Sequence, residues 1–393
     1  MKTIGTVVRG IRAPIIKQGD DLVSIVAESV QSAATESGFS FHDRDIVAVT
    51  EAVVARAQGN YATVDQIAKD VKAKTGGKTV GLVFPILSRN RFSLLLKGIA
   101  QGVEKLIIQL SYPSDEVGNP LVTLDQIDEA GVNPFVDSFT EAEFRKAFPS
   151  IAHPFTKVDY IDLYKNYAGE HCEVVISNKP DYILNFTDTV INADIHTRKR
   201  TKRILLEKGA KKVISLDEIL TESVDGSGFN PMTGLLGSNM ATDTSVKLFP
   251  KNCQEFVDAL AEKMHEMTGK NIEVMIYGDG AFKDPVGGIW ELADPMVSPA
   301  YTAGLCGAPN ELKLKYLADN KISNLSGEEA VHAMKDLIKQ KSSDLAGDMA
   351  SQGTTPRRLT DLLGSLCDLT SGSGDKGTPI VFIQNYFDNY SND

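Results

Sequence analysis

The chain has 393 residues, of which 42% are apolar and 24% are charged, a composition that suits two or three globular domains and excludes a disordered chain, a coiled coil or a collagen-like rod. Its 41 Lys and Arg residues against 52 Asp and Glu residues give a net charge of −11, which argues against nucleic-acid binding because that requires surplus basic residues. No apolar run approaches the roughly 20 residues of a membrane helix, so no membrane partner is expected.

Four cysteines are widely spaced and form no CxxC pair, so the sequence predicts neither a zinc site nor a disulfide framework. We interpret them as reduced, buried thiols of a cytoplasmic protein. They are Cys172, Cys253, Cys306 and Cys367.

Strand and helix patterns alternate at the start of the chain. A helix is predicted over 22–30, because two preceding Asp residues suit an N-cap and a first turn. The β-branched run at 45–50 predicts a strand, and residues 51–57 predict a helix. A further strand is predicted over 80–87, with a basic turn after it at 88–91.

The central part of the chain has a different texture. Strand-like pieces lie at 105–110, 173–177 and 182–185 among Pro-rich and Asp-rich connections. The basic stretch at 198–203 either forms a solvated helix face or binds the phosphate or carboxylates of an acidic substrate.

The last part of the chain is more regular. An amphipathic helix is predicted over 254–268, where Gly269 ends it, and a strand over 272–277. The pattern then predicts two helices and a final buried strand, over 327–339, 357–369 and 379–383.

Two glycine-rich segments resemble phosphate-binding motifs. The segment Gly76-Gly77-Lys78-Thr79 lacks the first glycine of a P-loop and is interpreted as a surface turn. Residues 372–377 match G-x-G-x-x-G, but a helix precedes them and a strand follows, which reverses the order of the dinucleotide fingerprint. This order disfavours an NAD-dependent dehydrogenase, and the segment is either a cradle for a phosphate or metal–phosphate unit or a flexible turn.

Asp279 directly follows a predicted strand and lies between Gly278 and Gly280. A carboxylate on a tight turn can hold a divalent cation through its oxygen atoms, and flanking glycines let backbone or ligand approach closely. The same position suits a hydrogen-bonded turn aspartate, so both interpretations stay open at this point.

Six segments in chain order resemble the coenzyme F420-0:L-glutamate ligases, which add glutamate to a deazaflavin coenzyme. APIIKQGDDL at 13–22 resembles the family's IPLIKPGDDL, and DIVAVTEAVVARAQG at 45–59 resembles DVLVVTEKIVSKAEG. GLLGSN at 234–239 resembles GVDASN, and VMIYGDGAF at 274–282 resembles VVISDTFG. The other two segments are VKLFP at 246–250 and DLTSGSGDKGTP at 368–379.

This resemblance implies an α+β fold with mixed β-sheets and helices. Residues 1–100 and 231–393 would form the ligase core, and residues 101–230 an inserted α/β subdomain. The resemblance also implies a homodimer.

The chemistry implied is that of an amide ligase. It would use GTP, or ATP in its place, with Mg2+ or Mn2+, to add L-glutamate to a carboxylate of a cofactor-like small molecule through an acyl phosphate. Phosphoryl transfer requires positioning and charge neutralisation by metal ions, basic side chains and backbone N–H groups.

The site residues follow from the same resemblance. Arg56 and Asp279 would be catalytic, with Arg56 at a position where the family has Lys. The metal ligands would be Asp279 and Ser373. The nucleotide-binding residues would be Pro14, Ile15, Ile16, Lys17, Glu51, Arg56, Asn239, Ser371, Gly372, Ser373, Gly374, Asp375, Lys376, Gly377 and Thr378.

The chain departs from the family pattern near the metal. Leu236 aligns with the family's metal-binding Asp and cannot ligate a cation, while Gly280 and Ser373 replace a Thr and a Gln. The alternative function is therefore a non-catalytic descendant that binds a nucleotide or an anionic metabolite. If a metal site is kept, the acids that could replace the missing ligand are Asp115, Asp188, Asp243, Asp284 and Asp375.

Overall fold

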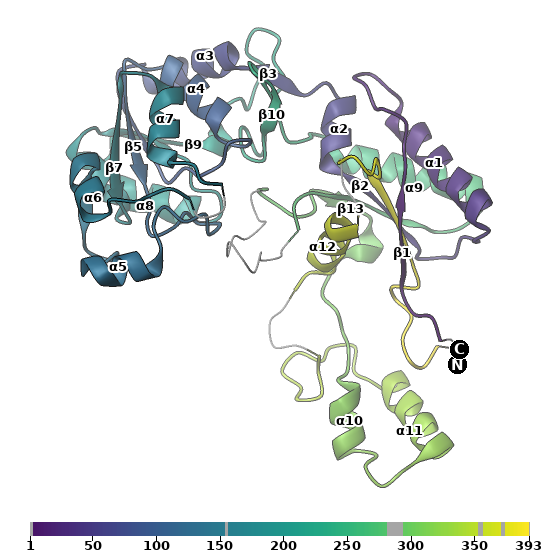
Figure 1. Cartoon of the computed structure of the whole chain (residues 1–393). Coiled ribbons are helices and arrows are strands. Elements are labelled where there is room, and N and C mark those ends of the chain that lie inside the picture. The colour runs from purple at the N-terminus through teal and green to yellow at the C-terminus, as the bar shows by residue number, and fades with distance from the viewer. Residues whose placement is uncertain (1–2, 154–155, 281–293, 353–356, 371–373, 393) are drawn as a thin grey trace.

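A core body, an α/β body and a helical lobe make up the chain (Figure 1). The lobe carries α10 (Leu314–Asn320) and α11 (Gly327–Lys339). Helices and mixed sheets together confirm the predicted α+β class. The computed structural model describes residues 3–153, 156–280, 294–352, 357–370 and 374–392.

The core body is built on a five-stranded sheet in the order β1-β14-β2-β12-β13. Strands β2 and β12 run parallel, and the other neighbouring pairs are antiparallel. The strands are β1 (Val7–Ile11), β2 (Ile46–Thr50), β12 (Glu273–Tyr277), β13 (Ala300–Tyr301) and β14 (Ile380–Gln384).

Helices cover both faces of this sheet. Alternate residues of β2 pack with α1 (Leu22–Ser37) and α9 (Cys253–Thr268) on one face, and the others pack with α12 (Leu359–Thr370) on the opposite face. This follows from the two-residue period of a strand that is buried on both sides. Asp21 caps α1 and Gly269 ends α9 in the left-handed conformation, as predicted.

A six-stranded sheet forms the α/β body, in the order β6-β7-β5-β4-β8-β9. Five strands are parallel, β6 is an antiparallel edge, and the parallel strands stand in the chain order 3-2-1-4-5 of doubly wound sheets. The strands are β4 (Thr79–Val83), β5 (Lys105–Leu110), β6 (Ser138–Thr140), β7 (Cys172–Ser177), β8 (Thr189–Asn192) and β9 (Lys212–Ser215).

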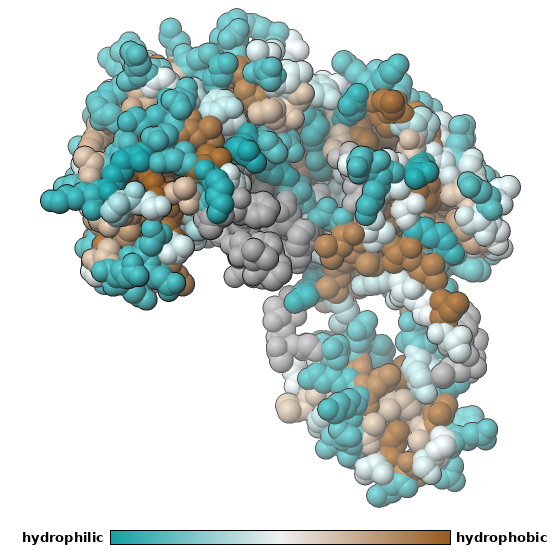
Figure 2. Space-filling model, in the orientation of Figure 1, coloured by the Kyte–Doolittle hydropathy of each residue, from teal (hydrophilic) through white to brown (hydrophobic). Residues whose placement is uncertain are grey.

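Helices pack on the two faces of this second sheet, and hydrophilic residues cover much of the outer surface of the α/β body (Figure 2). One apolar face holds α3 (Val64–Thr75), α4 (Ser93–Gln101) and α7 (Tyr160–Ala168), and the other holds α8 (Arg198–Glu207) and the 3-10 helix η1 (Pro180–Asn185). The remaining helices of this body are α5 (Leu124–Ala130), α6 (Glu141–Ala147) and the 3-10 helix η2 (Leu216–Glu218).

Residues 182–185 were predicted as a strand, which is wrong: they belong to η1. Pro180 stands at the first position of this helix, where its fixed φ favours a helical turn and its missing N–H is not needed. The six-stranded sheet also crosses the boundary predicted at residue 100, because β4 pairs in parallel with β5. The division into three domains and the insertion of 101–230 stay predictions.

The cysteines and the helices bear on two further predictions. All four cysteines are free, and three are buried, but Cys306 is exposed at the end of the 3-10 helix η3 (Ala303–Leu305), so its predicted burial is wrong. Among the described residues, no helix is long and apolar enough to span a bilayer.

Candidate active site

Four segments that are distant in the sequence converge at one edge of the core sheet. The parallel strands β2 and β12 both end there, so Glu51 and the turn of residues 278–280 lie at the same edge. Strand β1 ends and β14 begins at this edge too, which brings residues 13–16 beside residues 377–379. The topology of the sheet therefore gathers the segments that the family resemblance singled out.

A cavity of about 500 Å³ lies at this edge. Its volume is in the range of sites for small organic ligands. The predicted site residues that line it are Pro14, Ile15, Ile16, Glu51, Arg56, Asn239, Asp279 and Gly377. It is also lined by Arg91, Lys247 and Asp368, to which the sequence had assigned no role.

Arg56 joins two of these segments. It lies in α2 (Glu51–Ala57), and its Nε donates to the Ile16 carbonyl at 2.5 Å. The guanidinium therefore ties the loop of residues 13–17 to the helix that begins with Glu51, and its side chain lies at the exposed side of the cavity.

A three-stranded sheet lies between the two bodies (Figure 1), and residues of its strands line the cavity. It consists of β3 (Tyr61–Thr63), β10 (Asn239–Thr242) and β11 (Ser245–Lys247). The register places Lys247 opposite both Asn239 and Tyr61, and residues directly opposite share a face of the sheet. All three therefore present their side chains to the cavity.

Lys247 and Glu51 form a buried ion pair in the lining. The Lys247 Nζ donates to the two carboxylate oxygens of Glu51 at 2.8 and 2.6 Å. Burial raises the pKa of Glu51, and the positive charge of Lys247 opposes this rise. The pair fixes a cation and an anion side by side at the start of α2.

The turn after β12 is held by carboxylates from two other segments. Asp294 accepts a hydrogen bond from the Asp279 backbone N–H at 2.8 Å, and Asp368 of α12 accepts one from the Gly280 N–H at 3.0 Å. A Cβ at Gly278 would lie 2.3 Å from Asp294 Oδ2, so the close approach of that carboxylate requires glycine. Burial raises the pKa of Asp368, and the Asp294 charge adds to the rise.

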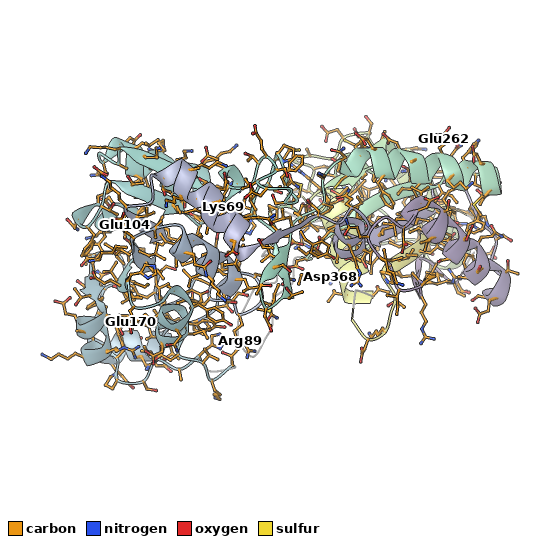
Figure 3. The ribbon with its side chains drawn as sticks, turned by 90° about the horizontal axis from the view of Figure 1, so that it is seen from above. Lys69, Arg89, Glu104, Glu170, Glu262 and Asp368 are labelled. Carbon is orange, nitrogen blue, oxygen red and sulfur yellow. The ribbon has the colours of Figure 1, made fainter. Side chains whose placement is uncertain are left out.

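Arg91 enters this acidic cluster from the α/β body. It lies between β4 and α4, and its two Nη atoms donate to Asp294 at 2.8 Å and to Asp279. Only 16% of the Arg91 side chain and 2% of the Asp294 side chain are exposed. Burial alone would lower the pKa of Arg91, but the surrounding carboxylates outweigh it and raise that pKa, so the guanidinium stays charged. Figure 3 shows Asp368 at the edge of the core body that faces the α/β body.

The acidic cluster has the right donor chemistry for a hard cation but not the right arrangement. Mg2+ and Mn2+ prefer carboxylate oxygens. Among the residues that the structure describes, however, no group of three or more His, Cys, Asp or Glu side chains is arranged to hold a metal ion. A positively charged guanidinium lies between Asp279 and Asp294 instead.

Leu236 lies outside this cluster. It is buried in the apolar core of the α/β body and does not line the cavity. The acid beside Asp279 is Asp294, which the sequence did not suggest as a replacement ligand. Among the acids that the sequence suggested as replacement ligands, Asp284 lies outside the described residues. The other four do not line the cavity: Asp115, Asp188, Asp243 and Asp375.

Several predicted nucleotide-binding residues lie away from the cavity. Lys376 and Thr378 line a neighbouring groove beside α1, and Lys17, Gly374 and Asp375 are not part of the cavity lining. Helix α12 precedes and β14 follows the glycine-rich segment, the order that disfavours a dinucleotide fingerprint. The residues that lie outside the described ranges are Ser371, Gly372 and Ser373.

The basic stretch at 198–203 begins α8, and none of its residues lines the cavity. Arg198 pairs with Asp217 at 2.7 Å, and Lys202 pairs with Glu218 at 2.5 Å. These partners favour the interpretation as a solvated helix face.

The family model described as F420-0:Gamma-glutamyl ligase matches residues 10–385 of the chain. The match runs through the central part, 101–230, as well as through the two outer parts. Curated proteins give no significant match.

Proposed function

The chain belongs to the F420-0:gamma-glutamyl ligase family, whose members are carbon–nitrogen ligases, and from this membership we propose that it joins L-glutamate to a carboxylate of a cofactor-like small molecule, with GTP or ATP as co-substrate. The match over residues 10–385 is the observation that carries the proposal. The cavity at the edge of the core sheet is the proposed active site, and a cytoplasmic homodimer is the proposed form of the protein.

The proposed reaction has two steps. A carboxylate oxygen of the substrate attacks the γ-phosphorus of the nucleotide, the bond to the bridging oxygen breaks, and the nucleoside diphosphate leaves. The amine of glutamate then attacks the carbonyl carbon of the acyl phosphate, the C–O bond breaks, inorganic phosphate leaves, and the amine gives up a proton.

The charged residues around the cavity support a divalent cation as part of the proposed reaction. Arg56 is the basic residue at the exposed side of the cavity, whereas Lys247 and Arg91 are paired with acids. A nucleoside triphosphate would meet the carboxylates of Asp279 and Asp368, of which Asp279 already pairs with Arg91. We therefore include Mg2+ or Mn2+ in the proposal, because a divalent cation bound with the nucleotide would neutralise this negative charge.

Calorimetric titration with GTP and ATP, each with Mg2+ or Mn2+, tests the proposal. We expect metal-dependent binding to the wild type and its loss in Asp279→Ala. Asp243→Ala is the matched control, because it removes the same charge from an exposed residue outside the cavity lining. Glutamate-dependent release of phosphate is the second assay. If neither nucleotide binds with either metal, the ligase proposal is wrong.

The alternative is a non-catalytic descendant that binds a nucleotide or an anionic metabolite. Two observations favour it: Leu236 is buried in an apolar core, and Arg91 already neutralises two of the acids. Nucleotide binding without any glutamate-dependent phosphate release would support this alternative against the ligase.

A further inference from the structure

Two ion pairs account for most of the charged side chains that line the cavity. Glu51 pairs with Lys247, and Asp279 pairs with Arg91. Of the carboxylates in this lining, Asp368 alone has no cationic partner within hydrogen-bond distance among the residues that the structure describes. A ligand that enters the cavity therefore meets one acid whose charge is not already used by a basic side chain.

The carboxylate of Asp368 is held in place but only partly engaged. Asp368 lies in the last turn of α12, directly after Cys367, which packs with Leu363 against the core sheet. The Oδ2 atom of Asp368 accepts the Gly280 N–H at 3.0 Å. No described residue donates a hydrogen bond to its Oδ1 atom, so this oxygen is available to a ligand.

The surroundings of Asp368 favour a positively charged ligand. A helix carries partial negative charge at its C-terminus, where cations are stabilised. Asp368 adds a carboxylate to the last turn of α12. Burial raises the pKa of Asp368, the charge of Asp294 adds to this rise, and Arg91 opposes it. A cationic group beside Asp368 would relieve this concentration of negative charge.

An ammonium group suits this single carboxylate better than a metal ion does. A divalent cation needs several oxygen ligands, and the described part of the chain offers no group of three or more His, Cys, Asp or Glu side chains to hold one. An ammonium can be held by one carboxylate through a charge-assisted hydrogen bond. We propose that Asp368 binds the amino group of L-glutamate, the nucleophile of the proposed reaction. The identity of this ligand rests on the proposed function.

Asp368 would also orient the amino acid in the cavity. It attracts the ammonium of L-glutamate and repels the two carboxylates, so the amino end turns towards the edge of the core sheet at residues 278–280. The carboxylates are left to face the exposed side of the cavity, where Arg56 supplies a cation. This residue would thus distinguish an amino acid from a simple dicarboxylate.

Calorimetric titration of the full chain with L-glutamate and with glutarate tests the inference, in buffer that contains EDTA and no nucleotide. Glutarate is the same dicarboxylate without the amino group. We expect the wild type to bind L-glutamate at least about tenfold more tightly than glutarate, as a charge-assisted hydrogen bond predicts. Asp368→Asn should abolish this preference by weakening the binding of L-glutamate. Loss of a negative charge alone would strengthen the binding of both ligands, so the expected change has the opposite sign.

Asp361→Asn is the matched control, because it removes the same charge from α12 outside the cavity lining. This variant should keep the preference of the wild type. Three results would overturn the inference: no binding of or no preference for L-glutamate in the wild type, an unchanged preference in Asp368→Asn, or an equal loss in Asp361→Asn.

Thermal melting establishes that each variant is folded, and asparagine at position 368 can still accept the Gly280 N–H. If Asp368→Asn does not fold, Asp368→Ser replaces it with the same expected loss, and an unchanged preference would again overturn the inference. Glutamate-dependent release of phosphate tests the ligase separately. If no phosphate is released while the preference depends on Asp368, the proposed reaction fails and the amino-group site stands.

Discussion

Replacement of Lys247 by Met would leave the Glu51 carboxylate buried without its partner. The two side chains are only 12% and 10% exposed, and their contacts are 2.6 and 2.8 Å long. Removal of one partner from a fully buried ion pair costs about 3–5 kcal/mol. Because both side chains of this pair keep some exposure at a cavity, we expect Lys247→Met to lower the free energy of unfolding by about 2–3 kcal/mol at neutral pH.

The loss should depend on pH, since burial raises the pKa of Glu51 and Lys247 opposes that rise. Without Lys247, the folded state keeps a proton on Glu51 at a pH at which the unfolded state has lost it. The folded state thus binds more protons, and the stability of the variant should fall as the pH rises above the unfolded pKa of about 4.3. The fall should end once the pH exceeds the folded pKa.

Urea unfolding of a double-mutant cycle checks both expectations. The four proteins are the wild type, Glu51→Gln, Lys247→Met and the double variant, each measured at about pH 5 and about pH 8. The double variant should regain most of the lost stability, because it buries no charge. If Lys247→Met is as stable as the wild type at both pH values, Glu51 is not held in a buried pair and the reasoning fails.

Two further predictions concern the turn after β12 and an acid of the α/β body. Gly278→Ala should lower the free energy of unfolding by about 1–3 kcal/mol, because the added Cβ would lie 2.3 Å from Asp294 Oδ2. Gly374→Ala is the control, because a Cβ at that position meets nothing within 4 Å. Equal melting temperatures of the two variants would contradict this prediction. Partial desolvation of the Glu116 carboxylate, beside the charge of Asp194, raises its pKa to about 8, although the residue as a whole is exposed. The contribution of Glu116 to stability should then fall as the pH rises from about 4.3 towards that value. Urea unfolding should therefore show a smaller loss of stability over this pH range in Glu116→Gln than in the wild type. An equal loss in the two proteins would contradict this prediction.

Elements with local signals were predictable from the sequence. Strand β2 follows from a β-branched run, α1 from its capping Asp21, and the end of α9 from Gly269. Each signal acts within a few residues, so no knowledge of the tertiary fold is needed to interpret it. The family resemblance likewise located Glu51, and Asp279 at the end of its strand, because both stand in continuous motifs.

Partners across the fold were not predictable in the same way. The sequence pattern of β4 predicts a strand but does not predict its partner. The domain boundary that we placed at residue 100 therefore separates two paired strands, β4 and β5. Arg91 was visible only as part of a basic turn, and its contact with Asp279 joins residues 188 positions apart in the chain. Nothing in the local sequence of Asp294 distinguishes it from a solvated acid, since its role depends on the tertiary approach to residues 278–280.

The topology of the α/β body gives Arg91 its place. In doubly wound sheets, ligands bind beyond the carboxyl ends of the strands at the point where the strand order reverses. Strands β4 and β8 flank that point here, and Arg91 lies in the connection that follows β4. This connection brings the charge of Arg91 to two acids of the core body. The two acids of the core body therefore receive this cationic partner from the α/β body.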